Sequence, residues 1–186
     1  MKKILTLLLG IIFLSSCTGA DETGLIKSTR TYETANFKID YPLDWEVIDR
    51  ARFEKEIPEN IVVGFRTNIK NEVFTTNVNI SIDIFEKEVK PKDFAFSTLS
   101  LASKELVDFK EIQIGETTVS INEIKQLAYY IEYEGRASAK DPNINFRQVF
   151  ASKGPVVYSI TRASLPSENE SIVNMANLML NSFTLK

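Results

Sequence analysis

Few side chains of this 186-residue sequence could do chemistry by type and spacing. The sequence contains no histidine and a single cysteine, Cys17. Histidine is the usual general base, the usual activator of a nucleophile and the commonest metal ligand, so its absence excludes triad hydrolases and typical zinc sites. Ser103 and Lys104 are neighbours on a predicted helix and face different directions, which favours a solvated surface over a Ser-Lys pair. We therefore expect no enzyme, no metal site and no cofactor.

Carboxylates and aromatic rings are the remaining candidates. Glu132 and Glu134 lie at strand spacing on one face, and a carboxylate pair can do acid-base chemistry, although solvent-facing acidic residues are commoner on strands. Tyr129 and Tyr133 fall on one face of the same strand and Tyr130 on the other. Such rings can anchor a partner, but packing in the core or on the sheet is the more frequent role.

One short acidic segment is similar to the start of a calcium loop. Asp141-x-Asn143-x-Asn145 matches the first ligand positions of an EF-hand. Phe146 then replaces the required glycine, and Ser152 stands where a bidentate glutamate belongs. We interpret the segment as a polar turn.

The N-terminus has the order of a secretion signal. Lys2 and Lys3 form a positive region, and residues 4–14 are apolar apart from one threonine and one glycine. This run is about half of the roughly 20 residues that a membrane-spanning helix needs. Leu14-Ser15-Ser16-Cys17 follows and resembles the bacterial lipobox, in which the cysteine thiol receives diacylglycerol. The sequence thus predicts a cleaved signal over residues 1–16 and a lipidated Cys17.

Lipidation at Cys17 would place the protein on a membrane of the cell envelope. Two or more acyl chains, such as diacylglycerol with palmitate, anchor a protein stably. Thr18 follows the cysteine in place of the aspartate that retains similar lipoproteins at the inner membrane. We expect the outer membrane in a cell with two membranes and the outer face of the cell membrane otherwise. Because the anchor would use the only thiol, no cysteine would remain for a disulfide or for catalysis.

Residues 17–31 are small and polar and suit a flexible tether, which leaves residues 32–186 for one globular domain. Cleavage after residue 16 removes two lysines and no acid, so the mature chain has 20 basic against 25 acidic residues and a net charge of −5. Lysine and arginine are scattered along the chain, which excludes a nucleic-acid footprint.

The domain alternates strand patterns with two helical stripes. Period-two alternation predicts strands, and the clearest run is Val78, Ile80, Ile82 and Ile84 between polar residues. The predicted strands cover residues 37–41, 45–47, 61–67, 78–84, 111–123, 127–135, 146–152 and 156–163, with Lys153-Gly154-Pro155 as a hairpin turn.

Helical spacing appears twice. Pro91 opens a stripe formed by Ala95, Leu99, Ala102, Leu106 and Phe109. The second stripe is formed by Ile172, Ala176, Met179 and Phe183, after a capping-box pattern over residues 167–170. Strands with one central and one terminal helix predict an α+β sandwich, in which helices pack on a mainly antiparallel sheet.

Three segments carry a family resemblance: residues 36–45 (NFKIDYPLDW), the late hairpin over residues 148–161, and the helix end at residues 181–183. They are similar to the family of the photosystem II extrinsic protein PsbP, which shares a fold with a Ran-binding nuclear import factor. The resemblance implies an α-β-α sandwich with a mainly antiparallel sheet, and a mostly non-enzymatic family whose members bind or help assemble other components. The metal binding known in that family is carried over to no residue of this sequence.

We therefore expect a membrane-anchored lipoprotein of the bacterial cell envelope that acts as a non-catalytic binding or assembly module. Its partners would be the membrane, through Cys17, and an envelope protein or glycan, with no nucleic acid. The alternative is a carboxylate-dependent hydrolase or small-ligand sensor in the envelope.

Overall fold

A computed structural model of the protein describes residues 28–186 except residue 56. Ten strands form one sheet in the order β1-β2-β10-β6-β7-β8-β9-β5-β4-β3, and every neighbouring pair is antiparallel except β10 with β6. The strands are β1 (Thr29–Glu33), β2 (Phe37–Pro42), β3 (Glu46–Asp49), β4 (Ile61–Arg66), β5 (Asn77–Ile84), β6 (Val107–Ile121), β7 (Ile124–Arg136), β8 (Ile144–Lys153), β9 (Val156–Ser164) and β10 (Thr184–Leu185). The helices are α1 (Pro91–Glu105), α2 (Glu170–Ser182) and a 3-10 turn, η1 (Arg50–Arg52).

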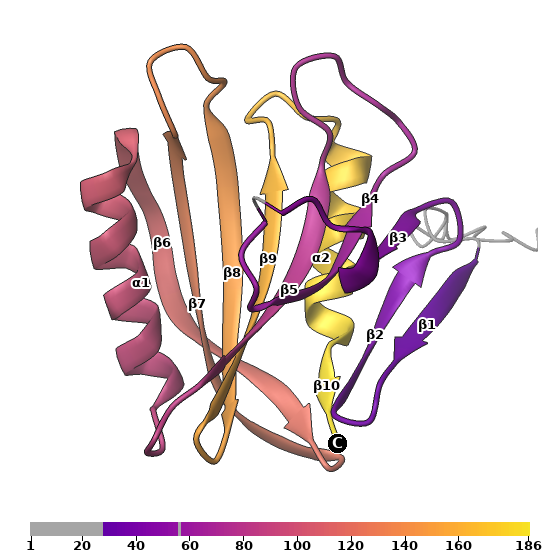
Figure 1. The fold of residues 1–186 in the computed structure, drawn as a ribbon, viewed down its shortest axis with the longest axis vertical. Helices are drawn as coiled ribbons and strands as arrows, with labels where there is room; N and C mark the ends of the chain where they lie inside the picture. Colours follow the sequence, from indigo (N-terminus) through magenta and orange to yellow (C-terminus); the bar gives the residue numbers. More distant parts are fainter. Residues whose placement is uncertain (1–27, 56) are drawn as a thin grey trace, which may run out of the picture.

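The two long helices cover opposite faces of a strongly curled sheet (Figure 1). Helix α1 buries Ala95, Leu99 and Ala102 against Ile131 and Phe150. The other face of the sheet closes over α2 and contains the larger core, to which β2, β4, β5, β9 and α2 contribute. The predicted α+β fold, an α-β-α sandwich with a mainly antiparallel sheet, is therefore confirmed.

The two helix ends differ from the sequence prediction. Helix α1 ends at Glu105, because Leu106 already has an extended backbone with ψ 137°. Phe109, which the helical spacing of the sequence includes in the stripe, lies in β6 but still packs against the core beneath α1. The cap of α2 is Asn169, whose side chain accepts a hydrogen bond from the Ser171 backbone N–H at 2.9 Å. The predicted capping box begins at Ser167, two residues before the observed cap.

The β6–β7 hairpin is tighter than predicted. Asn122 and Glu123 both have positive φ angles, of 49° and 68°, which is typical of a two-residue type I′ turn. The strand expected over residues 111–123 therefore ends at Ile121, and the next begins at Ile124. The predicted turn between β8 and β9 is confirmed, with Gly154 at φ 60°.

The sheet also begins before Tyr32. Residues 29–31, which were assigned to the tether, pair with residues 40–42 of β2, because antiparallel pairing satisfies their backbone groups. The predicted signal and Cys17 lie outside the described residues, so they stay predictions. Among residues 28–55 and 57–186, no helix is long and apolar enough to cross a membrane.

Candidate functional site

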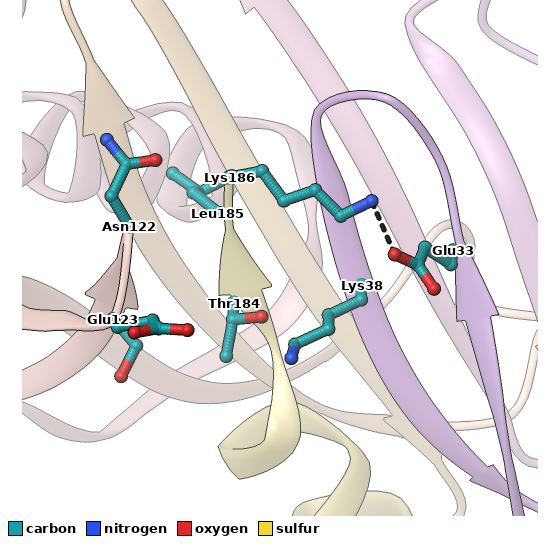
Figure 2. A pocket seen from close by; sticks show the side chains of 8 residues that line it. Glu33, Lys38, Asn122, Glu123, Thr184, Leu185 and Lys186 are labelled. Carbon is teal, nitrogen blue, oxygen red and sulfur yellow. Dashed lines mark ion pairs between the residues drawn. The ribbon is translucent and has the colours of Figure 1, made fainter.

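A hollow of about 670 Å³ lies where β10 joins the sheet, at the lower end of the molecule in Figure 1. It is lined by Glu33, Lys38, Ser120, Asn122, Glu123, Thr184, Leu185 and Lys186 (Figure 2). These residues come from the β1–β2 turn region, from the β6–β7 hairpin and from the C-terminal strand. Segments far apart in the sequence therefore build one surface.

Four of the eight lining residues belong to a row of polar side chains that runs across five neighbouring strands. The backbone register pairs Glu33 with Lys38, Lys38 with Thr184, Thr184 with Ser120, and Ser120 with Lys125. We call these five residues the polar row. Residues paired directly across a sheet point to the same face, so the row presents its side chains together.

The alternation of each strand explains which face the polar row occupies. Lys38 stands between buried Phe37 and Ile39, and Thr184 stands between buried Phe183 and Leu185. Successive side chains of a strand point to opposite faces. The apolar neighbours fill the core around α2, and the polar row therefore faces away from that core.

One ion pair occupies part of the hollow. Lys186 Nζ lies 2.6 Å from a carboxylate oxygen of Glu33 and also donates to the Thr34 carbonyl (Figure 2). The hydrogen bond and charge of Lys186 lower the pKa of Glu33, which keeps this carboxylate ionised. Glu33 is thus poorly suited to act as a general acid.

Other polar groups of the hollow are uncommitted. Lys38 points along the hollow toward Thr184 and has no ion-pair partner among the residues described (Figure 2). The Thr184 hydroxyl oxygen is buried and has no hydrogen-bond partner in the described part of the chain. An unpaired buried hydroxyl costs about 1–3 kcal/mol, so Thr184 lowers the stability of the fold at this point of the sheet.

A smaller hollow of about 270 Å³ adjoins the first and shares Ser120 and Thr184 with it. It also contains Lys125, Asn181 and two threonines of β6, together with four apolar side chains of the core around α2, Val119, Val149, Leu180 and Phe183. β10 has only two residues, which pair with Ser120 and Ile121 of β6. In the described chain, the part of β6 that precedes Ser120 therefore has no strand partner on that side, and the smaller hollow lies there. Together the two hollows display hydroxyl, amide, ammonium and carboxylate groups.

The predicted carboxylate pair lies outside these hollows. Glu132 and Glu134 share a face, as expected, but both oxygens of Glu132 are occupied: one lies 3.0 Å from Arg147 and the other 3.2 Å from Arg162. Arg162 is only 3% exposed and also donates to Asn177 at 2.7 Å. Burial lowers the pKa of Arg162, and Glu132 opposes that shift. The cluster therefore joins three strands to α2 and leaves Glu132 without a free oxygen.

The tyrosines occupy the faces that the alternation predicted. Tyr129 and Tyr133 are buried beneath α1, whereas Tyr130 packs against the core around α2. The Tyr130 ring covers Gly115 of the neighbouring strand, and the Arg147 guanidinium stacks over that ring at 4.6 Å from its centroid. These rings are packing elements.

The segment that is similar to the start of a calcium loop is the last of the candidates from the sequence. Asp141 and Asn143 lie in the polar turn before β8, whereas Asn145 lies within β8 and its side chain accepts a hydrogen bond from Arg162. Across the described ranges, 28–55 and 57–186, no group of three or more acidic, histidine or cysteine residues could hold a metal ion.

A third hollow, of about 480 Å³, is separate from these two and lies on the polar side of β5. Glu46 forms ion pairs there with Arg52 at 2.6 Å and Arg66 at 2.7 Å, and these two hydrogen bonds lower the pKa of Glu46. Asn77 and Asn79 line the same hollow. The alternation of β5 predicted this polar face, but only the fold brings Arg52 and Arg66 to Glu46.

Sequence reasoning did not single out Lys38, Ser120 or Thr184. Each is an ordinary polar residue between two apolar ones, which is what any half-buried strand shows. Their contact depends on a two-residue strand near the C-terminus that inserts between β2 and β6. A strand that short has no periodicity to detect.

Comparison with solved structures identifies the fold. No known family model matches the sequence, and no curated protein sequence matches it either. The solution structure of cyanobacterial PsbP (CyanoP) from Synechocystis sp. PCC 6803 matches with a TM-score of 0.61 and 17% identity, over 93% of this chain and 99% of that chain. LpqN of Mycobacterium tuberculosis, described as involved in cell envelope biogenesis, matches with a TM-score of 0.56 and 11% identity, over 86% and 91%.

Both likenesses extend over nearly the whole length of the compared chains, at identities that speak to fold alone. They agree with the sandwich that the sequence predicted. The chain therefore has the PsbP-like α+β fold.

Proposed function

We propose that this protein is a lipid-anchored, non-catalytic binding module of the bacterial cell envelope. Leu14-Ser15-Ser16-Cys17 after an apolar signal supports the anchor. The fold shared with LpqN, whose description names cell envelope biogenesis, is consistent with an envelope role. The location would be the outer membrane in a cell with two membranes and the outer face of the cell membrane otherwise.

The observation that carries the binding role is the set of uncommitted polar groups in the two adjoining hollows. Lys38 can donate, Glu123 can accept, and Ser120 and Asn122 can do both. Sugar hydroxyls donate and accept in the same way, so this mixture suits a glycan better than a purely anionic or apolar ligand. We take a glycan of the envelope as the ligand class.

The hydrolase alternative has weaker support from the carboxylates. The pKa values of Glu33 and Glu46 are both lowered by basic partners, whereas a general acid needs a raised pKa. Glu132 has both oxygens bound to arginines. No observation on these residues favours a catalytic role.

Lipidation can be tested by growing cells with labelled palmitate. Label should enter the wild-type protein and be absent from Cys17→Ser, which should also leave the membrane fraction. Equal labelling of the two proteins would disprove the anchor.

Ligand binding can be tested with insoluble cell-wall glycan from the source organism. Wild-type protein should co-sediment with it, and Lys38→Ala should reduce the bound fraction at least fivefold. Lys104→Ala, on the exposed side of α1, is the matched control and should bind normally. Normal binding by Lys38→Ala would contradict a binding role for the hollow. A photo-crosslinker placed at Asn122 in intact cells tests the ligand class: capture of a protein would show that the partner is a protein and not a glycan.

A further inference from the structure

Three apolar side chains are exposed close to the point where the chain enters the domain. Leu43 is 46% exposed in the β2–β3 corner, and Ile69 and Val73 are 60% and 63% exposed in the loop between β4 and β5. We call these three residues the apolar end. Single exposed apolar residues are common on protein surfaces, so these three indicate a contact surface only if their positions in the fold are related.

Hydrogen bonds connect the corner and the loop to the start of the described chain. The Leu43 backbone N–H donates to the Ser28 carbonyl at 3.2 Å. The side chain of Asn68, next to Ile69, donates to the Asp44 carbonyl, next to Leu43. The loop that carries Ile69 and Val73 is closed at its base by a backbone bond from Thr67 to Thr76.

The apolar end and the polar hollows lie at opposite ends of β1. Ser28 directly precedes β1 at one end. Glu33 is the last residue of β1 at the other end, and it lines the larger hollow. In Figure 1 the β4–β5 loop projects from the upper end of the molecule, and the C-terminus and the β6–β7 hairpin lie at the lower end. A surface that faces the apolar end therefore leaves the hollows accessible.

The chain outside the structure indicates what would cover the apolar end. Cys17 precedes Ser28 by eleven residues, which can span at most about 40 Å even when fully extended. A lipid on Cys17 would therefore keep Ser28, which is hydrogen-bonded to the β2–β3 corner, within about 40 Å of the bilayer surface. At such an effective concentration even a weak contact is well populated.

We infer that Leu43, Ile69 and Val73 rest in the headgroup region of the membrane that Cys17 anchors, so that the polar hollows face away from it. This inference rests on the proposed lipid anchor. The contact fixes the orientation of the domain, and the lipid supplies the attachment.

The single cysteine makes the inference measurable on the full-length lipidated protein. The Cys17 sulfur is a thioether after lipidation, so Ile69→Cys supplies the only free thiol for an environment-sensitive fluorophore. Ile124→Cys is the matched control, because Ile124 is 67% exposed and adjoins the hairpin that lines the hollow. Both variants are reconstituted in phosphatidylcholine–phosphatidylglycerol vesicles that contain lipids spin-labelled at the headgroup.

The spin label should quench the fluorophore at position 69 at least threefold more than the fluorophore at position 124. Equal quenching in protein that floats with the vesicles would overturn the inference and leave the anchor intact. Protein that fails to float would overturn the anchor and the inference together. Repeating the measurement with Val73→Cys guards against a local effect of the label, and it too should exceed position 124.

Discussion

The hydroxyl of Tyr32 in β1 donates a 3.1 Å hydrogen bond to the carboxylate of Asp49 in β3, and these strands are the two opposite edges of the ten-stranded sheet. The Tyr32 ring also meets Phe65 of β4 edge-on, with ring centroids 5.6 Å apart. The sheet therefore curls until its edges touch through side chains. The first described strand, which follows the predicted anchor, closes this contact.

Removal of that hydroxyl should loosen the contact between the edges. We expect Tyr32→Phe to lower the free energy of unfolding by about 0.5–1 kcal/mol, the usual net contribution of one exposed hydrogen bond. Tyr41→Phe is the control, because Tyr41 packs on the same Phe65 at 5.3 Å with no recorded hydrogen bond of its hydroxyl among the described residues. Urea unfolding measures both variants, and equal losses would contradict a specific role for the Tyr32–Asp49 bond.

The buried arginine cluster should depend on one carboxylate of the predicted pair. Glu132→Gln removes the charge that compensates Arg162, and we expect a loss of about 3 kcal/mol in unfolding free energy. Glu134→Gln, on the same face but in no recorded ion pair of the described chain, should change stability by less than about 0.5 kcal/mol. Thermal and urea unfolding of the two variants provide the comparison; similar values would show that the cluster contributes little.

Gly115 should tolerate no side chain while Tyr130 covers it. A Cβ at Gly115 would lie 2.9 Å from the Tyr130 ring, whereas a Cβ at Gly64 would meet its nearest neighbour, Phe53, at 3.5 Å. We expect Gly115→Ala to cost about 1–3 kcal/mol and Gly64→Ala far less. The double variant Gly115→Ala with Tyr130→Ala should be more stable than the sum of the single losses predicts, and strict additivity would refute the clash.

Burial of a phenol should make stability fall at high pH. Burial raises the pKa of Tyr133 to about 12, above its ordinary value of 10.0. The contribution of the protonated Tyr133 phenol to the free energy of unfolding is therefore fully present below pH 10 and is lost as the pH rises toward about 12. The reason is that Tyr133 loses its phenol proton at a lower pH in the unfolded chain than in the folded protein. Urea unfolding between pH 9 and 12 should show a shallower decline for Tyr133→Phe than for wild type. Parallel curves would indicate that Tyr133 ionises as easily in the folded protein.

Thr184→Val should separate binding from stability. The substitution keeps the shape and removes a buried hydroxyl that has no partner among the described residues, so we expect stability to be unchanged or to rise by up to about 1 kcal/mol. Binding to cell-wall glycan should stay within about twofold of wild type, because the buried hydroxyl is closed to a ligand in the open hollow. A clear loss of stability would instead show that the Thr184 hydroxyl already has a partner in the folded protein.

The sequence alone predicted the architecture well because alternation and helical spacing are local properties. The alternation placed Val78 and Ile80 in the core, although Ile84 at the end of the same run is 78% exposed, and the stripe of Ala95, Leu99 and Ala102 placed α1 on its correct face. The errors fell at element ends. Asn122 and Glu123 form a turn without glycine, and Phe109 continues the helical spacing past the point where the backbone becomes extended.

The sequence by itself also determined the candidate anchor, since a lipobox is read along the chain and needs no fold. Only the tertiary structure decided which polar residues meet. Lys38, Thr184 and Ser120 are distant in the sequence, and they become neighbours because β10 inserts between β2 and β6. Glu132 became a structural group for the same reason, since the register of β7, β8 and β9 brings two arginines to it. The pairing of distant strands depends on the register of the whole sheet, which no local pattern specifies.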